Sequence, residues 1–500
     1  MISLPTIPSR PTALLPTHED DALILRERMD KPQRHRLLHG YPLAAAMHTR
    51  DMSRSARDVA FNPRAGRGLL VGVLPHPFCN PAVAGCGFCT FPHQAYNSSA
   101  AASVVEHVLR EIDQLLRRQP ALYRRKVTGL YFGGGTANLT PTEPFRRLCR
   151  RLAATFDLSQ AEITLEGVPA YFVKRQPLLV DILREEIPAR HFRLSMGIQT
   201  FDEGQLRRMG RLAFGTADTF RQVVELAHER GFTVSADLLC NLPGQTLDAM
   251  RHDLAQAAAI GLDHLGLYHL VLFRGLGTAW SRDADLLAAL PDNEEAARNW
   301  LHLRDDLLSR DFVQTTLTNF ERAHFRADAR RFLYEECSFH SDRFDMIGFG
   351  SSAISFSANR SFRSGFKVIN PDNAAAYEVA VAAGGPVWDR WFWYTQRDLR
   401  VFHLTRRLAA LSIDRREYRR LFGADAVNDF PREFDALSDE GLIEIASGTI
   451  RPTPRGMFYA DSIAALLAWR QVRALRRQNL LVAAARAEQD EANDNALGHM

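Results

Sequence analysis

Three of the six cysteines in this 500-residue chain lie close together, with the spacing Cys79-x6-Cys86-x2-Cys89. The other three are far apart, at Cys149, Cys240 and Cys337. Clustered cysteines of this kind indicate a metal site. Three thiolates leave one iron of a [4Fe–4S] cluster free to take an external ligand, whereas four would close the cluster. The alternative is a zinc site completed by His76 or His93, because paired cysteines are also common zinc ligands.

A second group of candidate residues lies further along the chain. The glycine run 133–135 follows an apolar segment and precedes Thr136, so a ligand can approach the backbone closely and meet a hydroxyl. Glu166, Gln199 and Asp237 each lie at or near the end of a predicted strand. A tight turn explains a glycine run alone, and a helix cap explains a single polar residue. Together with the cysteines, the set favours a ligand that carries hydroxyl and amine groups.

Six apolar segments predict the strands that position these residues. Their ranges are 69–74, 127–132, 161–166, 192–199, 233–239 and 264–271. Helical patterns follow them, most clearly at 103–119, 217–230 and 246–260. Strands that alternate with helices predict a parallel, barrel-like sheet. The cysteines follow the first strand, and barrel-type folds carry their chemistry at the carboxyl ends of the strands.

The run Pro77-Phe78-Cys79, followed by Cys86-Gly87-Phe88-Cys89, resembles the radical S-adenosylmethionine (SAM) superfamily. Within it, the chain resembles the oxygen-independent coproporphyrinogen III oxidase-like group, which also contains haem chaperones and radical methyltransferases. Matching motifs extend from Pro77 to Gln245 and return at residues 345–355. The family usually places three residues between the first two cysteines, where this chain has six. The longer loop can still close on a cluster, because each doubling of loop length costs only about 0.6 kcal/mol.

The resemblance implies an α/β fold: a partial six-stranded parallel (βα)6 radical SAM barrel with a C-terminal α+β winged-helix-like domain. It implies that Cys79, Cys86 and Cys89 hold a [4Fe–4S] cluster and that one or two SAM molecules bind. The positions that match the family's SAM contacts are Phe88, Gly134, Gly135, Thr136, Glu166, Gln199, Arg211 and Asp237. Val271 and Ile354 match positions near a second SAM. The sequence assigns no catalytic residue.

The implied chemistry is cleavage of SAM to a 5′-deoxyadenosyl radical that acts on a small organic substrate, with electrons from a partner such as flavodoxin or ferredoxin. Three interpretations remain open: radical methyl or methylene transfer, oxidative decarboxylation of a porphyrinogen, and haem carriage by a chaperone. The decarboxylases carry a tyrosine and a histidine where this chain has Val73 and Pro75. Ala137 also replaces a proline of the family pattern. These departures favour transfer over decarboxylation.

Five segments are expected along the chain. They are a partly disordered N-terminal arm (1–60), the radical SAM barrel (61–285), a connecting α/β segment that completes the active site (286–390), a winged-helix-like substrate lid (391–465), and a tail that is helical and then disordered from Glu488 (466–500). Residues 1–18 are rich in proline and predicted to be disordered. The helix within 430–444 is acidic, which argues against a DNA-binding winged helix.

Composition limits the classes of partner. The net charge is only +4, with a pI near 8.8, so no nucleic acid is expected. No apolar run approaches the roughly 18 residues that a membrane span needs, and the N-terminus lacks a basic and then apolar signal. We therefore expect a cytoplasmic monomer that does not bind membranes.

Overall fold

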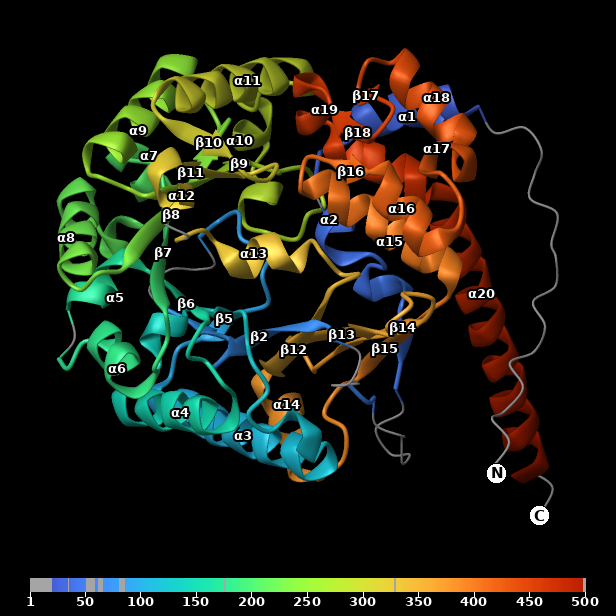
Figure 1. The fold of residues 1–500 in the computed structure, drawn as a ribbon, viewed down its shortest axis with the longest axis horizontal. Coiled ribbons are helices and arrows are strands. Elements are labelled where there is room, and N and C mark those ends of the chain that lie inside the picture. Colours follow the sequence, from blue (N-terminus) through green and yellow to red (C-terminus); the bar gives the residue numbers. More distant parts are fainter. Residues whose placement is uncertain are drawn as a thin grey trace.

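The computed structural model describes residues 20–34, 36–50, 59–61, 66–80, 86–174, 176–327 and 330–497 (Figure 1). The segment 1–18, which the sequence predicts to be disordered, lies outside these residues. Within them, no helix is both long and apolar enough to cross a membrane.

Six parallel strands form the centre of one large mixed sheet. They are β2 (Gly68–Leu74), β5 (Gly129–Phe132), β6 (Glu162–Gly167), β7 (His191–Gln199), β8 (Thr233–Cys240) and β9 (His264–His269), adjacent in that order. Each neighbouring pair is parallel, so the carboxyl ends of all six meet at one edge. The predicted parallel (βα)6 arrangement is confirmed, with each strand within a few residues of its expected range.

Amphipathic helices cover the outer face of this sheet (Figure 1). The main ones are α3 (Ser98–Arg118), α4 (Thr142–Thr155), α6 (Leu179–Glu186), α8 (Ala217–Glu229), α9 (Leu247–Ala259) and α11 (Asn293–Ser309). In α3, the valines 104, 105 and 108 recur at helical spacing with Ile112, and all four are fully buried. This apolar stripe packs the helix against the strands.

The sheet continues past both edges of the six strands. β12 (Phe344–Gly350) pairs in parallel with β2, and β13 (Ile354–Ala358), β14 (Gly365–Ile369), β15 (Arg390–Tyr394) and β1 (His48–Thr49) follow in antiparallel order. At the opposite edge, β11 (Asn319–Arg322) pairs with β9 and with β10 (Phe312–Gln314). The connecting segment therefore adds strands to both ends of the barrel sheet.

A short helix, α13 (Leu333–Ser338), lies inside the curve of the sheet (Figure 1). Two strand glycines provide the room for it. A Cβ at Gly129 would lie 2.9 Å from the Tyr334 Cα, and one at Gly72 would lie 3.0 Å from the Tyr334 hydroxyl. A larger side chain at Gly129 would therefore displace the helix backbone, and one at Gly72 would displace the Tyr334 ring.

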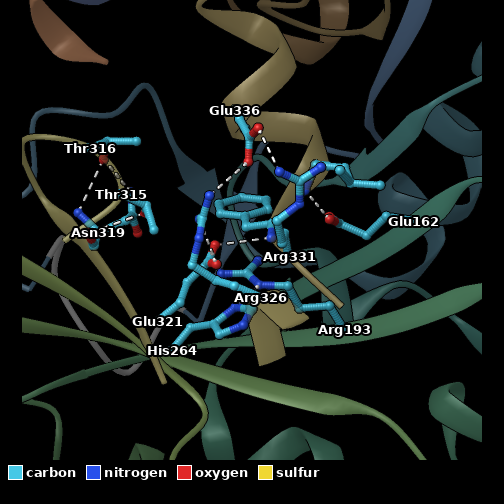
Figure 2. A network of polar contacts seen from close by, with 12 residues as sticks. Glu162, Arg193, His264, Thr315, Thr316, Asn319, Glu321, Arg326, Arg331 and Glu336 are labelled. Carbon is cyan, nitrogen blue, oxygen red and sulfur yellow. Dashed lines mark hydrogen bonds and ion pairs between the residues drawn. The ribbon is translucent and has the colours of Figure 1, made fainter. Parts of the chain in front are cut away.

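A buried polar network fixes the segment before α13 to the amino-terminal halves of the strands (Figure 2). The Arg193 Nε donates to His264 at 3.3 Å, and the guanidinium lies 3.6 Å from the centre of the Phe332 ring. The backbone N–H of Phe332 donates to Glu321 at 3.0 Å, and that of Leu333 donates to Glu162. These contacts fix the segment before α13 at the amino-terminal end of the barrel.

The C-terminal domain has the helices and hairpin that the sequence predicts. Its elements are α15 (Gln396–Ala409), β16 (Ile413–Asp414), α16 (Arg415–Phe422), α17 (Ala426–Asp429), α18 (Pro431–Asp439), β17 (Ile443–Ile445), β18 (Thr449–Pro452), α19 (Pro454–Phe458) and α20 (Ala460–Leu497). The last helix continues to Leu497, and so includes described residues of the tail that composition predicts to be disordered.

Residues 20–34 and 36–42, in the predicted N-terminal arm, pack against this domain. Both α1 (Asp21–Met29) and α2 (Arg36–Gly40) contact α20, and α2 also contacts α15. Leu25 and Leu38 are fully buried. The Tyr41 hydroxyl donates to Asp398 at 3.0 Å. The start and the end of the chain therefore share one core.

Candidate active site

The strand-end residues predicted from the sequence line one cavity of about 240 Å³. It contains the three clustered cysteines and all eight residues that match SAM contacts. It lies at the carboxyl ends of the parallel strands. Val271 and Ile354 do not line it, and each lines a different cavity.

The cysteine-bearing loop is fixed by short backbone contacts on either side of residues 81–85, which lie outside the described residues. β3 (Phe78–Cys79) pairs in parallel with β4 (Gln94–Ala95). The backbone N–H of Trp280 donates to the Gly87 carbonyl at 3.0 Å. The Trp280 ring also meets Phe88 edge-on at 5.9 Å. The segment after β9 therefore positions the second and third cysteines.

All three cysteines are free thiols and are partly exposed to the cavity. Burial raises the pKa of Cys79 to about 11, against a hydrogen bond with Thr136 that lowers it. Burial also raises the pKa of Cys89. The Arg211 guanidinium donates to the Cys86 sulfur at 3.1 Å. A metal must therefore displace protons from these thiols, and a cation is already in place to stabilise thiolate charge.

Three cysteine thiols line the same cavity, and thiolates are the ligands that hold iron–sulfur clusters. Among the described residues, no three His, Cys, Asp or Glu side chains stand close enough together to hold a single metal ion. The two histidines of the zinc alternative differ in position. His93 lines the cavity, whereas the His76 ring is buried between Phe78 and Tyr96.

The glycine loop after β5 lies directly against the cysteine loop. A Cβ at Gly135 would lie 2.7 Å from both the Phe78 carbonyl oxygen and the Pro77 carbonyl carbon. Gly134 adopts a φ of +111°, a conformation that L side chains rarely adopt. These two glycines bring backbone groups to the wall of the cavity. Ala137, at the position of the family's proline, is buried and begins a 3₁₀ turn.

Two half-buried carboxyl groups, Glu166 of β6 and Asp237 of β8, line the cavity from strands on either side of β7. Burial, followed by the nearby Asp237 charge, raises the pKa of Glu166 to about 7, and burial raises the pKa of Asp237 to about 6. The Tyr131 hydroxyl donates to Glu166 at 3.0 Å. Gly266 leaves room for Asp237, because a Cβ there would lie 2.5 Å from its Oδ1. Carboxyl groups in this setting are suited to bind ligand hydroxyl and amine groups.

A bulge in β7 and a buried arginine complete the site. The register between β7 and β8 shifts between Gly197 and Gln199, where Gln199 has a φ of +75°. Such bulges re-aim a side chain near active sites. Arg211 is 7% exposed, donates to the Gly197 carbonyl and lies over the Phe214 ring. Its Nε has no hydrogen-bond partner, so the guanidinium retains a donor for a ligand.

Several lining residues were not predicted from the sequence. They are Phe91, Gly167, Val168, Gly197 and Phe214, whereas His93 was considered only as a zinc ligand and Ala137 only as a departure from the family pattern. Most of these five lie close to predicted residues in the sequence, and no periodic pattern distinguishes them. Tyr131 was part of a predicted strand, and its alternation with the buried residues Leu130 and Phe132 was the one available sign that it faces inward.

Comparisons with known proteins agree with this geometry. Residues 73–257 match the model of the radical SAM superfamily. The chain is similar to the heme chaperone HemW of Haemophilus influenzae, with 30% identity over 200 residues, 39% of this chain and 49% of the relative. It is also similar to the anaerobilin synthase of Escherichia coli O157:H7, with 32% identity over 201 residues, 39% of this chain and 41% of the relative. The matches span about half or less of these relatives' lengths.

The structure of coproporphyrinogen III oxidase (HemN) from Escherichia coli, described as a radical SAM enzyme, has the same fold. It superposes with a TM-score of 0.65 at 21% identity, covering 81% of this chain and 90% of that chain. The match therefore extends past the barrel into the C-terminal part. Taken together, these findings show that residues 73–257 match the radical SAM superfamily, and that the chain is similar in sequence to HemW and anaerobilin synthase and in fold to HemN.

Proposed function

We propose that this protein is an enzyme that holds a [4Fe–4S] cluster through Cys79, Cys86 and Cys89 and binds SAM in the rest of the same cavity. The observation that carries the proposal is that one cavity is lined by all three cysteines and by all eight matched SAM positions. When bound and reduced by one electron, the cluster would supply the cleavage of SAM to methionine and a 5′-deoxyadenosyl radical, which takes a hydrogen atom from the substrate.

The chain's own groups bind and orient the cofactor in this proposal. The Arg211 guanidinium meets the SAM carboxylate, because it is planar, buried and has a free donor. Glu166 accepts hydrogen bonds from the ribose hydroxyls. The backbone of the glycine loop holds the amino end. Phe88, held against Trp280, provides a flat apolar surface for the adenine. The helices and strands around the cavity exclude bulk water.

We propose methyl or methylene transfer to a small organic substrate in preference to decarboxylation of a porphyrinogen. Val73 is fully buried in β2, and Pro75 is also buried. Neither side chain has a group that can transfer a proton where the oxidases carry tyrosine and histidine. The use of a second SAM has no comparable support, because Val271 and Ile354 line separate cavities. We also propose a cytoplasmic flavodoxin or ferredoxin as the electron donor.

Haem carriage is the second candidate function, and the similarity to a protein named heme chaperone HemW favours it. A carrier should bind haem stoichiometrically and release no 5′-deoxyadenosine. Product analysis of the anaerobically reconstituted, reduced protein with SAM separates the candidates. We expect 5′-deoxyadenosine, and S-adenosylhomocysteine as well when the substrate is methylated. Release of carbon dioxide from coproporphyrinogen III with a kcat of about 0.1 s⁻¹ or more, without S-adenosylhomocysteine, would establish decarboxylation instead.

A further inference from the structure

A second cavity, of about 200 Å³, lies between the extended edge of the sheet and the C-terminal domain. Its walls are largely apolar and aromatic, and include Tyr334 of α13, Phe356 of β13 and Phe402 of α15. Two cations also line it: Lys367 of β14 and Arg406 of α15. Both are almost completely buried, at 5% and 7% exposure.

Neither cation is paired with a carboxylate within the described residues. Lys367 donates to the carbonyls of Gly40 and Pro42, both at 3.0 Å. Arg406 donates to the carbonyls of His39 and Ser338, at 3.1 and 2.8 Å. Burial, followed by the charge of Arg406, lowers the pKa of Lys367 to about 7. Buried charges are normally paired with an opposite charge. The Arg406 guanidinium is therefore an excess positive charge without a carboxylate partner among the described residues, and an anion in the cavity would also favour the charged form of Lys367.

The acidic groups near the cavity do not remove the excess. Asp345 lines the cavity but already binds Arg67 at 2.7 Å and Arg125 at 3.2 Å, so this group of three carries a net positive charge. Glu335 acts on Arg406 electrostatically, but burial raises the Glu335 pKa to about 7. Its carboxyl group accepts hydrogen bonds from Asn319 and Thr316, outside this cavity.

Two buried donors at the cavity have no hydrogen-bond partner. They are the Arg406 Nε and the Ser341 hydroxyl. A purely structural role, in which the cations only hold the carbonyls of residues 39–42, leaves both donors unsatisfied. An unsatisfied buried donor costs about 1–3 kcal/mol. An acidic group of a ligand in the cavity would neutralise the cations that line it.

The cavity is close to the candidate active site. His39, Tyr334 and Ser338 line it and also line a cavity of about 240 Å³ inside the barrel. Asp237 lines that inner cavity and the cavity of the cysteines. Together the two non-cysteine cavities reach the usual size of a small-molecule site, about 300–1,000 Å³. The three cavities therefore adjoin one another.

We propose that Lys367 and Arg406 bind a carboxylate of the substrate, whose apolar or aromatic body lies against Tyr334, Phe356 and Phe402. The substrate class is an amphipathic carboxylic acid. A free cationic group on the substrate would be repelled at this end of the site. This inference rests on the proposed function for the identity of the ligand as substrate, but its binding step can be measured without turnover.

The test is equilibrium dialysis of the reconstituted protein with radiolabelled 3-phenylpropionate, benzoate and indole-3-propionate, in the absence of reductant. We expect saturable binding of at least one of these acids at one equivalent per chain. The matching neutral amide should bind at least tenfold more weakly. Lys367→Met and Arg406→Gln should each weaken acid binding at least tenfold. Lys174→Met, which removes an exposed lysine, should leave it unchanged.

A further variant controls for the possibility that Lys367→Met or Arg406→Gln weakens binding only because the protein unfolds. Ile354 is 41% exposed at the edge of the cavity, so Ile354→Trp should block binding while leaving both cations and the melting temperature unchanged. Absence of saturable binding by every acid at about 10 mM, above the roughly millimolar Kd expected for ligands of this size, would overturn the inference. Displacement of the acid by SAM would also overturn it, because the cavity would then belong to a second SAM.

Different results would refute the proposed function and the proposed carboxylate-binding site. Formation of 5′-deoxyadenosine without any acid binding would refute only the carboxylate-binding site. Acid binding that depends on Lys367 and Arg406, without 5′-deoxyadenosine under any condition, would support that site and refute the proposed radical SAM activity.

Discussion

Replacing Gly135 by alanine tests whether the glycine loop proposed to bind SAM and the cysteine loop proposed to hold the cluster form one unit. The added Cβ would lie 2.7 Å from two backbone atoms, the Phe78 oxygen and the Pro77 carbonyl carbon, where ordinary contacts measure 3.4–4 Å. Neither atom belongs to a flexible side chain, so the two loops must separate. Because Phe78 precedes Cys79 directly, the separation moves a cluster ligand.

The magnitude follows from the cost of overpacking, about 1–3 kcal/mol. That corresponds to a loss of roughly 5- to 150-fold in the equilibrium for seating the loops together. We expect Gly135→Ala to lower iron and sulfide per chain after anaerobic reconstitution and to weaken SAM binding to the fraction that retains a cluster. Iron and sulfide assays with equilibrium dialysis of labelled SAM measure both effects.

The matched control is Gly448→Ala in the hairpin of the C-terminal domain, where a Cβ would meet nothing within 4 Å. This variant should reconstitute and bind SAM as the parent protein does. If Gly135→Ala keeps the parental iron content and SAM affinity, the two loops are not coupled as described. A large fall in melting temperature in this variant alone would show instead that the glycine serves the general fold.

Three further predictions follow from the site and the core. Anaerobic reconstitution should give about four iron and four sulfide per chain, with absorbance near roughly 400 nm, and a variant with all three clustered cysteines replaced by alanine should lose both. Glu166→Ala should weaken SAM binding by about 1–3 kcal/mol without loss of the cluster, and unchanged affinity by equilibrium dialysis would show that Glu166 does not contact SAM. Burial raises the pKa of Glu111 to about 7 from an ordinary value of 4.5, so the native state holds its proton more tightly than the unfolded state, and stability should fall by about 3 kcal/mol as pH rises from 4.5 through 7. Glu111→Gln should flatten this fall in melting temperature between pH 5 and pH 8, and an equal fall in both proteins would refute the assignment.

The central strands and the SAM-side residues were predictable from the sequence for a physical reason. Apolar runs such as 69–74 and 233–239 identify buried strands, and parallel strands bring their carboxyl ends to one edge. Residues at or near the carboxyl ends of such strands, including Glu166 and Asp237, therefore converge even though they are far apart in sequence. The convergence of these strand-end residues could therefore be predicted without knowing how the side chains pack.

Long-range pairings were not predictable in the same way. A hydrophobic pattern shows which face of a segment is buried but not which segment covers it. The pairing of β12 with β2 joins residues more than 270 positions apart, as the ion pair between Arg67 and Asp345 illustrates. The same limit applies to the docking of residues 20–42 on the C-terminal domain. It also applies to Val271 and Ile354, which the family pattern associates and the structure places in different cavities.

The most direct test of the central claim is electron paramagnetic resonance of the reduced, reconstituted protein with and without SAM. If SAM binds the open iron of a cluster held by Cys79, Cys86 and Cys89, the spectrum of the reduced cluster should change on addition of SAM. Arg211→Leu should require higher SAM concentrations for the same change, because it removes the cation facing the SAM carboxylate. A spectrum that SAM leaves unchanged at saturating concentration would contradict the account.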